Sequence, residues 1–154
     1  MDAIARALQG GMIMREILFR GKRTDNGEWV EGNLVLSPNA DEGYQTIVIP
    51  CYYNYMYSSD YNNDVGFEKW YKVEPETVGQ FTGLTDKNGK KIFEGDIVKG
   101  FAYGTSYIAE TKFLNAMFCF ELPVNLRLHF DGDIDVEVIG NIHDNPELLK
   151  GEEK

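Results

Sequence analysis

The fold is decided by one stretch near the middle of the chain, Glu76-Thr-Val-Gly-Gln-Phe-Thr-Gly-Leu-Thr-Asp-Lys-Asn-Gly-Lys-Lys-Ile-Phe-Glu-Gly-Asp-Ile-Val-Lys99. Two apolar runs in it flank a tight hairpin turn, because Asn88-Gly89 tolerates the positive φ angles that such a turn needs. A second reversal at Gly95-Asp96 starts another strand. We therefore predict that Asn88, Gly89, Gly95 and Asp96 are structural turn residues, and that Gly79 and Gly83 lie where strands bend.

Short strand patterns continue from this stretch toward both termini. Apolar and polar residues alternate over short runs, which are then interrupted by glycine, asparagine or aspartate. Turns about every 8–12 residues indicate an all-β barrel or sandwich, and strands this short favour a small antiparallel barrel or roll. The predicted strands are 17–20, 29–36, 46–49, 70–73, 78–84, 91–93, 97–103, 106–113, 116–122, 126–130 and 134–139.

Two predictions concern the C-terminal quarter of the chain. The last two strands, 126–130 and 134–139, have the most regular alternation, and Asp131-Gly-Asp133 between them predicts that they pair as a hairpin. Asn145 can cap a final short helical turn that begins at Pro146, since proline is favoured at the first helical position.

A chain of 154 residues is most simply one domain. Residues 1–13 are expected to form a flexible or short helical extension that ends at Gly10-Gly11. Residues 14–149 are expected to form one β domain, with an N-terminal part over about 14–75 and a barrel part over about 76–143. The tail, 150–154, is expected to fray.

Charge and composition exclude several classes of protein. The net charge of −10 comes from 25 acidic and 15 basic residues, which disfavours binding to nucleic acid. No window approaches the roughly 18 apolar residues of a membrane span, and the N-terminus does not resemble a signal peptide, so we expect a cytoplasmic protein. Cys51 and Cys119 are expected to be reduced, buried thiols. The basic cluster Arg15, Arg20, Lys22 and Arg23 is predicted to be a solvated strand end.

Residues 51–65 differ from the rest of the chain because tyrosines are spaced there by asparagine, serine and aspartate. Such residues supply contact area and adaptable hydrogen bonds at binding surfaces. An exposed hairpin or Ω-loop packed partly on the sheet is the favoured interpretation, and an interaction loop is the alternative. The residues of that possible loop are Tyr52, Tyr53, Tyr55, Tyr57 and Tyr61.

No motif predicts catalysis, a metal or a cofactor. Asp131-Gly-Asp-Ile-Asp135 begins like a calcium loop, but an EF-hand would need glycine at 136 and glutamate at 142, where valine and isoleucine stand. The spacing of His129, His143 and the cysteines does not predict a nucleophile–base pair. The glycines of the central stretch match no phosphate-binding motif.

Three segments together resemble the YopX family of phage and prophage proteins. They are Met14-Arg-Glu-Ile-Leu-Phe-Arg20, the central stretch from Thr77 to Val98, and Val138-Ile-Gly-Asn-Ile-His-Asp-Asn-Pro-Glu-Leu148. The resemblance implies a mainly β protein with an SH3-like barrel in its C-terminal half and an origin in a phage or prophage within a bacterial cytoplasm. It implies no catalytic residue.

The function expected from these observations is a non-enzymatic protein that acts through protein contacts. Free strand edges and the tyrosine-rich stretch favour self-assembly into a homo-oligomer or binding to a host or phage protein. The alternative is a small β-barrel that stacks nucleic-acid bases on its tyrosines, which the net charge opposes. An enzyme is a remote third possibility, and no cofactor is expected.

Overall fold

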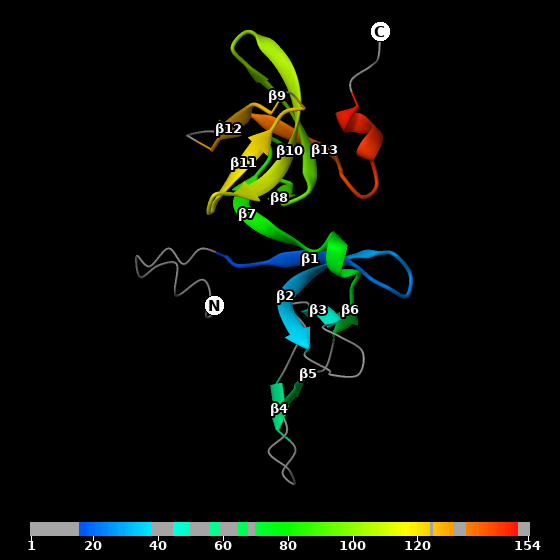
Figure 1. Ribbon diagram of the computed structural model, residues 1–154. Coiled ribbons are helices and arrows are strands. Elements are labelled where there is room, and N and C mark those ends of the chain that lie inside the picture. Colours follow the sequence, from blue (N-terminus) through cyan, green and yellow to red (C-terminus); the bar gives the residue numbers. More distant parts are fainter. Residues whose placement is uncertain are drawn as a thin grey trace, which may run out of the picture.

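Two main antiparallel sheets and a separate two-stranded pair make up the fold (Figure 1). The structure is a computed structural model that describes residues 16–37, 45–49, 56–58, 65–67, 70–123, 125–130 and 135–150. Within these ranges no helix is long and apolar enough to cross a membrane. In chain order, the elements are β1 (Phe19–Lys22), β2 (Trp29–Ser37), β3 (Gln45–Ile49), β4 (Met56–Ser58), β5 (Val65–Phe67), β6 (Tyr71–Lys72), the 3-10 helix η1 (Pro75–Thr77), β7 (Gly79–Thr85), β8 (Lys91–Phe93), β9 (Asp96–Ala102), β10 (Thr105–Leu114), β11 (Met117–Glu121), β12 (Arg127–His129), β13 (Val136–Asn141) and the 3-10 helix η2 (Pro146–Leu149).

The first sheet has the strand order β6-β3-β2-β1-β7-β8. β1 and β2 form a hairpin, in which Lys22 lies opposite Trp29 and Gly27 takes a φ of +72° in the turn. Val73, directly after β6, forms an isolated antiparallel β-bridge with Arg23, directly after β1. The chain that follows the edge strand β6 therefore lies beside the chain that follows the inner strand β1. Gly21 permits this approach, because a Cβ there would lie 3.0 Å from the Val73 side chain.

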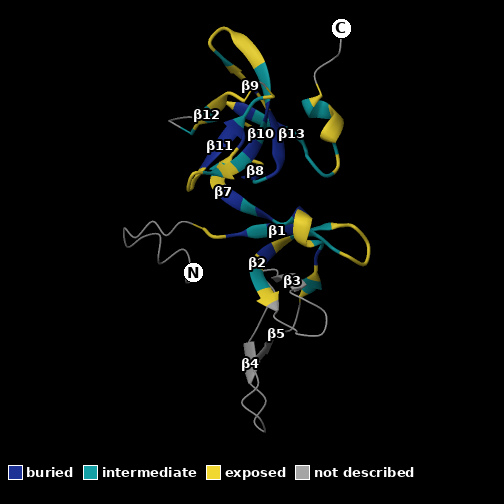
Figure 2. Ribbon diagram, viewed as in Figure 1, coloured by how far each residue is buried: buried dark blue, intermediate teal, exposed yellow. Residues whose placement is uncertain are grey.

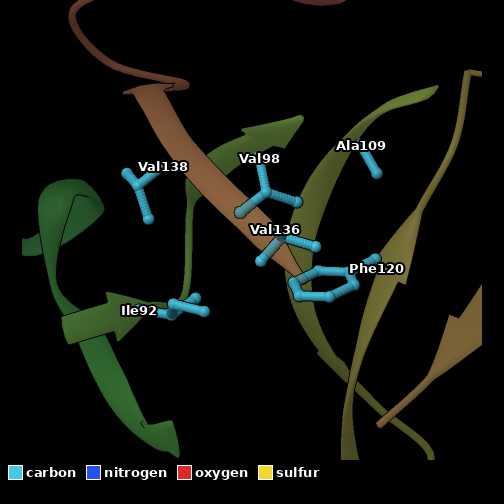
Figure 3. Close-up of a cluster of buried hydrophobic side chains, with 6 residues drawn as sticks. All are labelled: Ile92, Val98, Ala109, Phe120, Val136 and Val138. Carbon is cyan, nitrogen blue, oxygen red and sulfur yellow. The ribbon is translucent and has the colours of Figure 1, made fainter. Parts of the chain in front are cut away.

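The second sheet has the order β12-β11-β10-β9-β13 and contains the larger core. Two of its hairpins turn through two residues each, Tyr103-Gly104 after β9 and Asn115-Ala116 after β10. Figure 2 shows buried positions, in dark blue, along β10, β11 and β13, and Figure 3 shows six side chains of the core. Full burial of an aliphatic or aromatic side chain contributes roughly 1.5–3 kcal/mol. The six residues are Ile92, Val98, Ala109, Phe120, Val136 and Val138.

The β7–β8 hairpin, which is the central stretch of the sequence, belongs to both halves of the molecule. By hydrogen bonding it continues the first sheet, since Phe19 and Arg20 of β1 pair with β7. By packing, Ile92 lies in the core of the second sheet, while Phe81 and Phe93 form a smaller cluster with Leu18. The hairpin therefore holds the two sheets together.

A bulge near the middle of β7 lets the hairpin bend in this way. The register with β8 shifts between Phe81 and Thr85, and Gly83, within that interval, takes a φ of +90°. At the start of the same strand, a Cβ on Gly79 would lie 2.4 Å from the backbone oxygen of Glu94. Both glycines lie where the strand bends or approaches another backbone, as the sequence predicts.

The turn of this hairpin is fastened to β13 by a buried carboxylate. Asp86 Oδ1 accepts hydrogen bonds from the backbone N–H groups of Asn88, at 2.8 Å, and Lys90, at 2.9 Å. Its Oδ2 accepts one from the N–H of Val138, at 3.0 Å, and the N–H of Lys87 donates to the carbonyl of Val136 at 3.0 Å. β13 is an edge strand, and the Asp86 side chain and the Lys87 N–H occupy hydrogen-bonding groups on its outer edge. They take the place that another strand could occupy.

The hairpin predicted from 126–130 and 134–139 is wrong. β12 pairs with β11, and β13 pairs with β9, so these two strands lie at opposite edges of the second sheet. Both strands form near the predicted positions, but their partners are chosen by packing: the alternating valines of β13 face the core formed with β8 and β9. Alternation identifies a buried face and leaves the neighbouring strand undetermined.

The predicted fold class is confirmed as mainly β with antiparallel sheets and a short C-terminal 3-10 turn, η2. The arrangement of β7 to β13 is compatible with the SH3-like barrel that was expected. The domain boundaries stay a prediction, and residues 1–13 and 151–154 lie outside the described residues.

Candidate functional site

A polar cleft of about 440 Å³ lies where β1 and β2 meet β9 and β13. Arg20 and Asp96 lie at its base, with a guanidinium Nη2 2.7 Å from a carboxylate Oδ1. Asp96 is 1 % exposed and Arg20 is 9 % exposed. The second oxygen of Asp96 accepts a hydrogen bond from the N–H of Phe93 at 2.8 Å. This buried ion pair links the first sheet to the turn between β8 and β9.

Burial and pairing act on Asp96 in opposite directions. Burial raises the pKa of its carboxyl group, and the guanidinium of Arg20 together with the Phe93 N–H only partly offsets that rise. The rings of Trp29 and Phe93 lie against the guanidinium, with centroids 4.7 Å and 4.9 Å from its central carbon. Both rings thus form cation–π contacts with the buried guanidinium of Arg20.

A second group of contacts closes one end of this cleft. The indole N–H of Trp29 donates to Asp144 Oδ2 at 2.8 Å, and the amide of Asn141 donates to the same oxygen at 2.9 Å. Lys22 forms an ion pair with the other oxygen. The hydrogen bonds with Lys22, Asn141 and Trp29 hold the pKa of Asp144 well below its usual range. The loop after β13 is thereby fixed to the β1–β2 hairpin.

The predicted solvated strand end is wrong for Arg20. Leu18, directly before β1, and Arg20, within β1, are both buried, whereas Ile17 is 63 % exposed. Lys22 pairs with Asp144, and Arg23 pairs with Asp25 at 2.5 Å, whereas Arg15 lies outside the described residues. A signal was available in the sequence, because Arg20 stands two positions after an apolar residue in a strand and so shares its face.

The three segments that carry the family resemblance meet at this cleft. Arg20 ends the first segment, Asp96 belongs to the second, and Gly140, Asn141 and Asp144 belong to the third. These residues are far apart in the chain, and only the packing of one sheet against the other brings them together. The segments that carry the family resemblance therefore contribute residues to an interface between the two sheets.

A second cleft, of about 380 Å³, is lined by residues of the five-stranded sheet, from β9 to β13. Its floor includes Phe120, which is buried and lies 4.5 Å, centroid to centroid, from the ring of Phe130. The side chain of Tyr107 lies directly over Gly100, its partner on β9. A Cβ on Gly100 would lie 2.4 Å from the tyrosine oxygen, so only glycine leaves room for the ring. We call this cleft the aromatic groove and define it by Phe101, Tyr103, Tyr107, Leu128 and Phe130.

One residue of the aromatic groove is held in a strained conformation. Tyr103 has a φ of +51° in the two-residue turn before β10, and its side chain is 93 % exposed. The left-handed region costs a non-glycine residue roughly 1–2 kcal/mol. Phe101, two residues earlier, is 67 % exposed. Because most of the surface of both residues is exposed, their rings contribute little packing that would offset the strain.

The histidines and Cys119 do not form a reactive pair. The register places Cys119 directly opposite His129 on neighbouring strands, a proximity that sequence spacing did not predict. The thiol is 1 % exposed, however, and burial raises its pKa, which is the opposite of what an activated nucleophile requires. His143 lies 6.0 Å from the Trp29 ring, and burial, then Arg20 and Lys22, lower its pKa. Among the described residues no group of three potential metal ligands converges.

The structure places the predicted turn residues but few of the tyrosines. Gly89 and Gly95 have φ angles of +80° and +83°, and Asp96 opens β9. Asn88 lies in the same turn as Gly89 without a positive φ, so only one residue of the pair uses that region. Tyr57 falls in β4, while the possible interaction loop otherwise lies outside the described residues, as do Cys51 and 131–134 of the calcium-like sequence. The interaction loop stays a prediction.

Comparison with known proteins identifies a family and a similar solved structure. The family model described as YopX protein matches residues 18–150. The crystal structure of protein EF1440 from Enterococcus faecalis is similar, with a TM-score of 0.58 and 27 % sequence identity over 88 % of this chain and 99 % of that one. No curated protein matches the sequence.

Proposed function

Because this chain belongs to the YopX family, we propose that it is a non-enzymatic protein of phage or prophage origin that acts in the bacterial cytoplasm by binding other protein chains. The observation that carries the proposal is Tyr103, which is strained and almost fully exposed at the rim of the aromatic groove. The two-residue turn requires a positive φ at this position, but asparagine or glycine would adopt it with less strain, so the turn does not explain why a tyrosine stands there.

The composition of the aromatic groove supports a protein partner. Tyrosine and phenylalanine are enriched at protein interfaces, where they bury large areas at low entropic cost. One wall is β12, an edge strand of its sheet among the described residues, and an edge strand can pair with an incoming strand. Self-assembly through this groove and binding to a host or phage protein both use the same surface.

The substitution Tyr103→Asn tests this proposal because stability and binding should change in opposite directions. Asparagine suits the first position of a two-residue hairpin turn, so the variant should be as stable as the native chain or more stable by about 1 kcal/mol. It should nevertheless lose the ring that contacts the partner. Size-exclusion chromatography with light scattering measures self-assembly, and capture from a bacterial lysate measures binding to other proteins.

Ala116→Gly is the matched control, since it relieves a left-handed residue in the other two-residue turn, at a φ of +63°, without touching the aromatic groove. The proposal expects an oligomer, or a captured protein, that the native chain and the control retain and Tyr103→Asn loses. A native chain that stays monomeric at every concentration and captures nothing sensitive to Tyr103→Asn would refute it.

Nucleic-acid binding is the second candidate because the aromatic groove also includes Arg127 and His129 in its lining. Exposed rings next to a cationic side chain such as Arg127 can stack bases, although the net charge of −10 opposes phosphate binding. Fluorescence anisotropy with labelled single-stranded DNA and RNA at low salt tests this. Binding that weakens with salt and disappears in Tyr103→Asn would favour it over a protein partner.

A further inference from the structure

The edge strand β12 directs part of its backbone away from its own sheet. The N–H of Leu122 donates to the carbonyl of Leu126 at 2.8 Å, and the same register continues along β11 and β12. Pairs that exchange hydrogen bonds alternate with pairs that do not in an antiparallel ladder. Leu128 therefore bonds to β11, whereas Arg127 and His129 point their N–H and C=O groups outward. Within the described part of the chain, these outward groups have no partner.

The opposite edge of the same sheet is covered. On β13, the N–H of Val138 donates to Asp86 and the carbonyl of Val136 accepts from the N–H of Lys87, both at 3.0 Å. Proteins usually cover exposed strand edges in such ways, because an exposed edge pairs readily with another chain. Among the described residues β12 has no such cover, so it is the edge that is open to an incoming strand.

The side chains of this edge suit pairing with an identical strand. Leu128 and Phe130 pack against the core, and alternation places Leu126, which is 51 % exposed, on the same face. In an antiparallel pairing of two copies about Leu128, Leu126 lies opposite Phe130 of the second copy, and Arg127 lies opposite His129 of the second copy. Each outward N–H then meets an outward C=O, and the exposed leucine is covered by a ring.

The charge of this edge also permits the approach of a second copy. The chain carries −10, so most surfaces of two copies repel each other. Residues 126–130 include no acidic residue, and the carboxylate of Glu121 on the neighbouring strand is already bonded to Arg127 at 3.2 Å. Physiological salt screens charges that lie more than roughly 8 Å apart. Two β12 strands can therefore meet without carboxylates facing each other across the pair.

We propose that a second copy of this chain pairs with β12 in a two-fold antiparallel arrangement centred on Leu128, which joins the two five-stranded sheets into one. The inference rests on the proposed function and selects self-assembly from its two forms. The exposed rings of Phe101 and Tyr103 border the same groove and supply contacts beside the strand pair. Standard interfaces bury about 800 Å² per partner, and β12 has three residues, so we expect a weak dimer with a micromolar dissociation constant.

Sedimentation velocity over a series of concentrations measures the dimer, and two substitutions at His129 test the edge. His129→Pro removes an outward N–H and no bond to β11, and proline is tolerated on an edge strand at such a position. It should abolish the dimer, and urea denaturation checks that the variant is folded. His129→Glu places a carboxylate opposite Arg127 of the second copy, so it should tighten the dimer by about two- to tenfold. Lys150→Gln, at an exposed residue away from β12, makes the same change in net charge and should not tighten it.

Disulfide trapping tests the register. Leu128 of each copy would lie on the two-fold axis in a pair that exchanges no hydrogen bond, where the Cα atoms are about 4.5 Å apart and a disulfide fits. Leu128→Cys should therefore form a covalent dimer when oxidised with diamide. Arg127→Cys is the matched control, because its partner in this register is His129 and not itself. The native chain gives the background from Cys51 and Cys119.

Three results would overturn the inference: a native chain that is monomeric at every concentration, a dimer that both His129 variants leave unchanged, or trapping through Leu128→Cys that is no faster than through Arg127→Cys. If His129→Pro does not fold, His129→Glu and the trapping decide. A monomer that captures a protein in a way that depends on Tyr103 would refute this inference and leave the proposed function standing. A dimer that His129→Pro abolishes and Tyr103→Asn retains would support the β12 pairing and refute the role given to Tyr103.

Discussion

The carboxylate of Asp86 gives the sharpest stability prediction, because it holds a hairpin turn and a distant strand at once. Replacement by alanine removes the acceptor of three backbone N–H groups, those of Asn88, Lys90 and Val138. Asp86 is 6 % exposed and Val138 is 9 % exposed, so water cannot readily replace the bond between them. The two turn N–H groups belong to exposed residues and can be hydrated.

The expected loss follows from these three bonds. Leaving the enclosed N–H of Val138 without an acceptor costs about 1–3 kcal/mol, and each turn bond adds about 0.5–1 kcal/mol. Asp86→Ala should therefore destabilise the fold by roughly 2–5 kcal/mol. For a chain of this length, that corresponds to a decrease in Tm of roughly 5–15 °C.

Urea denaturation of the native chain, Asp86→Ala and Asp86→Asn measures this effect. Asp86→Asn keeps an oxygen for the turn but can place an amide N–H against the N–H of Val138, so it should lose most of the contribution from β13 and retain the turn. Asp25→Ala, which removes an exposed turn carboxylate, is the control and should leave stability unchanged. A loss below about 0.5 kcal/mol for Asp86→Ala would refute the reasoning, because it would mean that β13 needs no partner at its outer edge.

The dependence on pH gives an independent check on the same residue. Burial alone would raise the pKa of Asp86, but the three backbone N–H groups outweigh it, so the folded-state pKa lies below the unfolded value of about 3.9. The stabilisation is therefore present above that unfolded value and is lost as the pH falls through the folded-state pKa. The difference in unfolding free energy between the native chain and Asp86→Ala should shrink in acid.

Three further predictions concern other positions. Ala116→Gly should stabilise the fold by about 0.5–1.5 kcal/mol, because it relieves a left-handed residue, and unchanged or lower stability in urea would contradict this. Gly79→Ala should destabilise it by about 1–3 kcal/mol, since the new Cβ would lie 2.4 Å from the oxygen of Glu94, and an unchanged Tm would argue against that contact. The bond with Lys22 lowers the pKa of Asp144, so Asp144→Asn should be less stable than the native chain above about pH 4, and the two stabilities should converge as the pH falls. Denaturation at several pH values measures the difference in unfolding free energy. A difference that persists in acid would contradict the prediction.

Much of the local structure could be predicted because it depends on residues close together in the chain. The glycines at 27, 83, 89 and 95 take positive φ angles in turns or at a bulge, as the turn sequences indicate. Strand positions follow from alternation, since the side chains of a strand point to opposite faces in turn. The candidate sites are less predictable: the cluster of basic residues predicts that Arg20 is solvated, and a positive φ at Tyr103 leaves no mark in the sequence.

By itself, then, the sequence determined a mainly β chain, its turns and its membership of the YopX family. Only the tertiary structure decided that β12 and β13 lie at opposite edges of a sheet, and that Arg20, Asp96 and Asp144 meet in one cleft. The physical reason is how far apart in the chain the interacting residues lie. A turn is set by the conformational preferences of about four neighbouring residues. Strand partners and buried ion pairs are set by which faces exclude water together, and that depends on the packing of the whole chain.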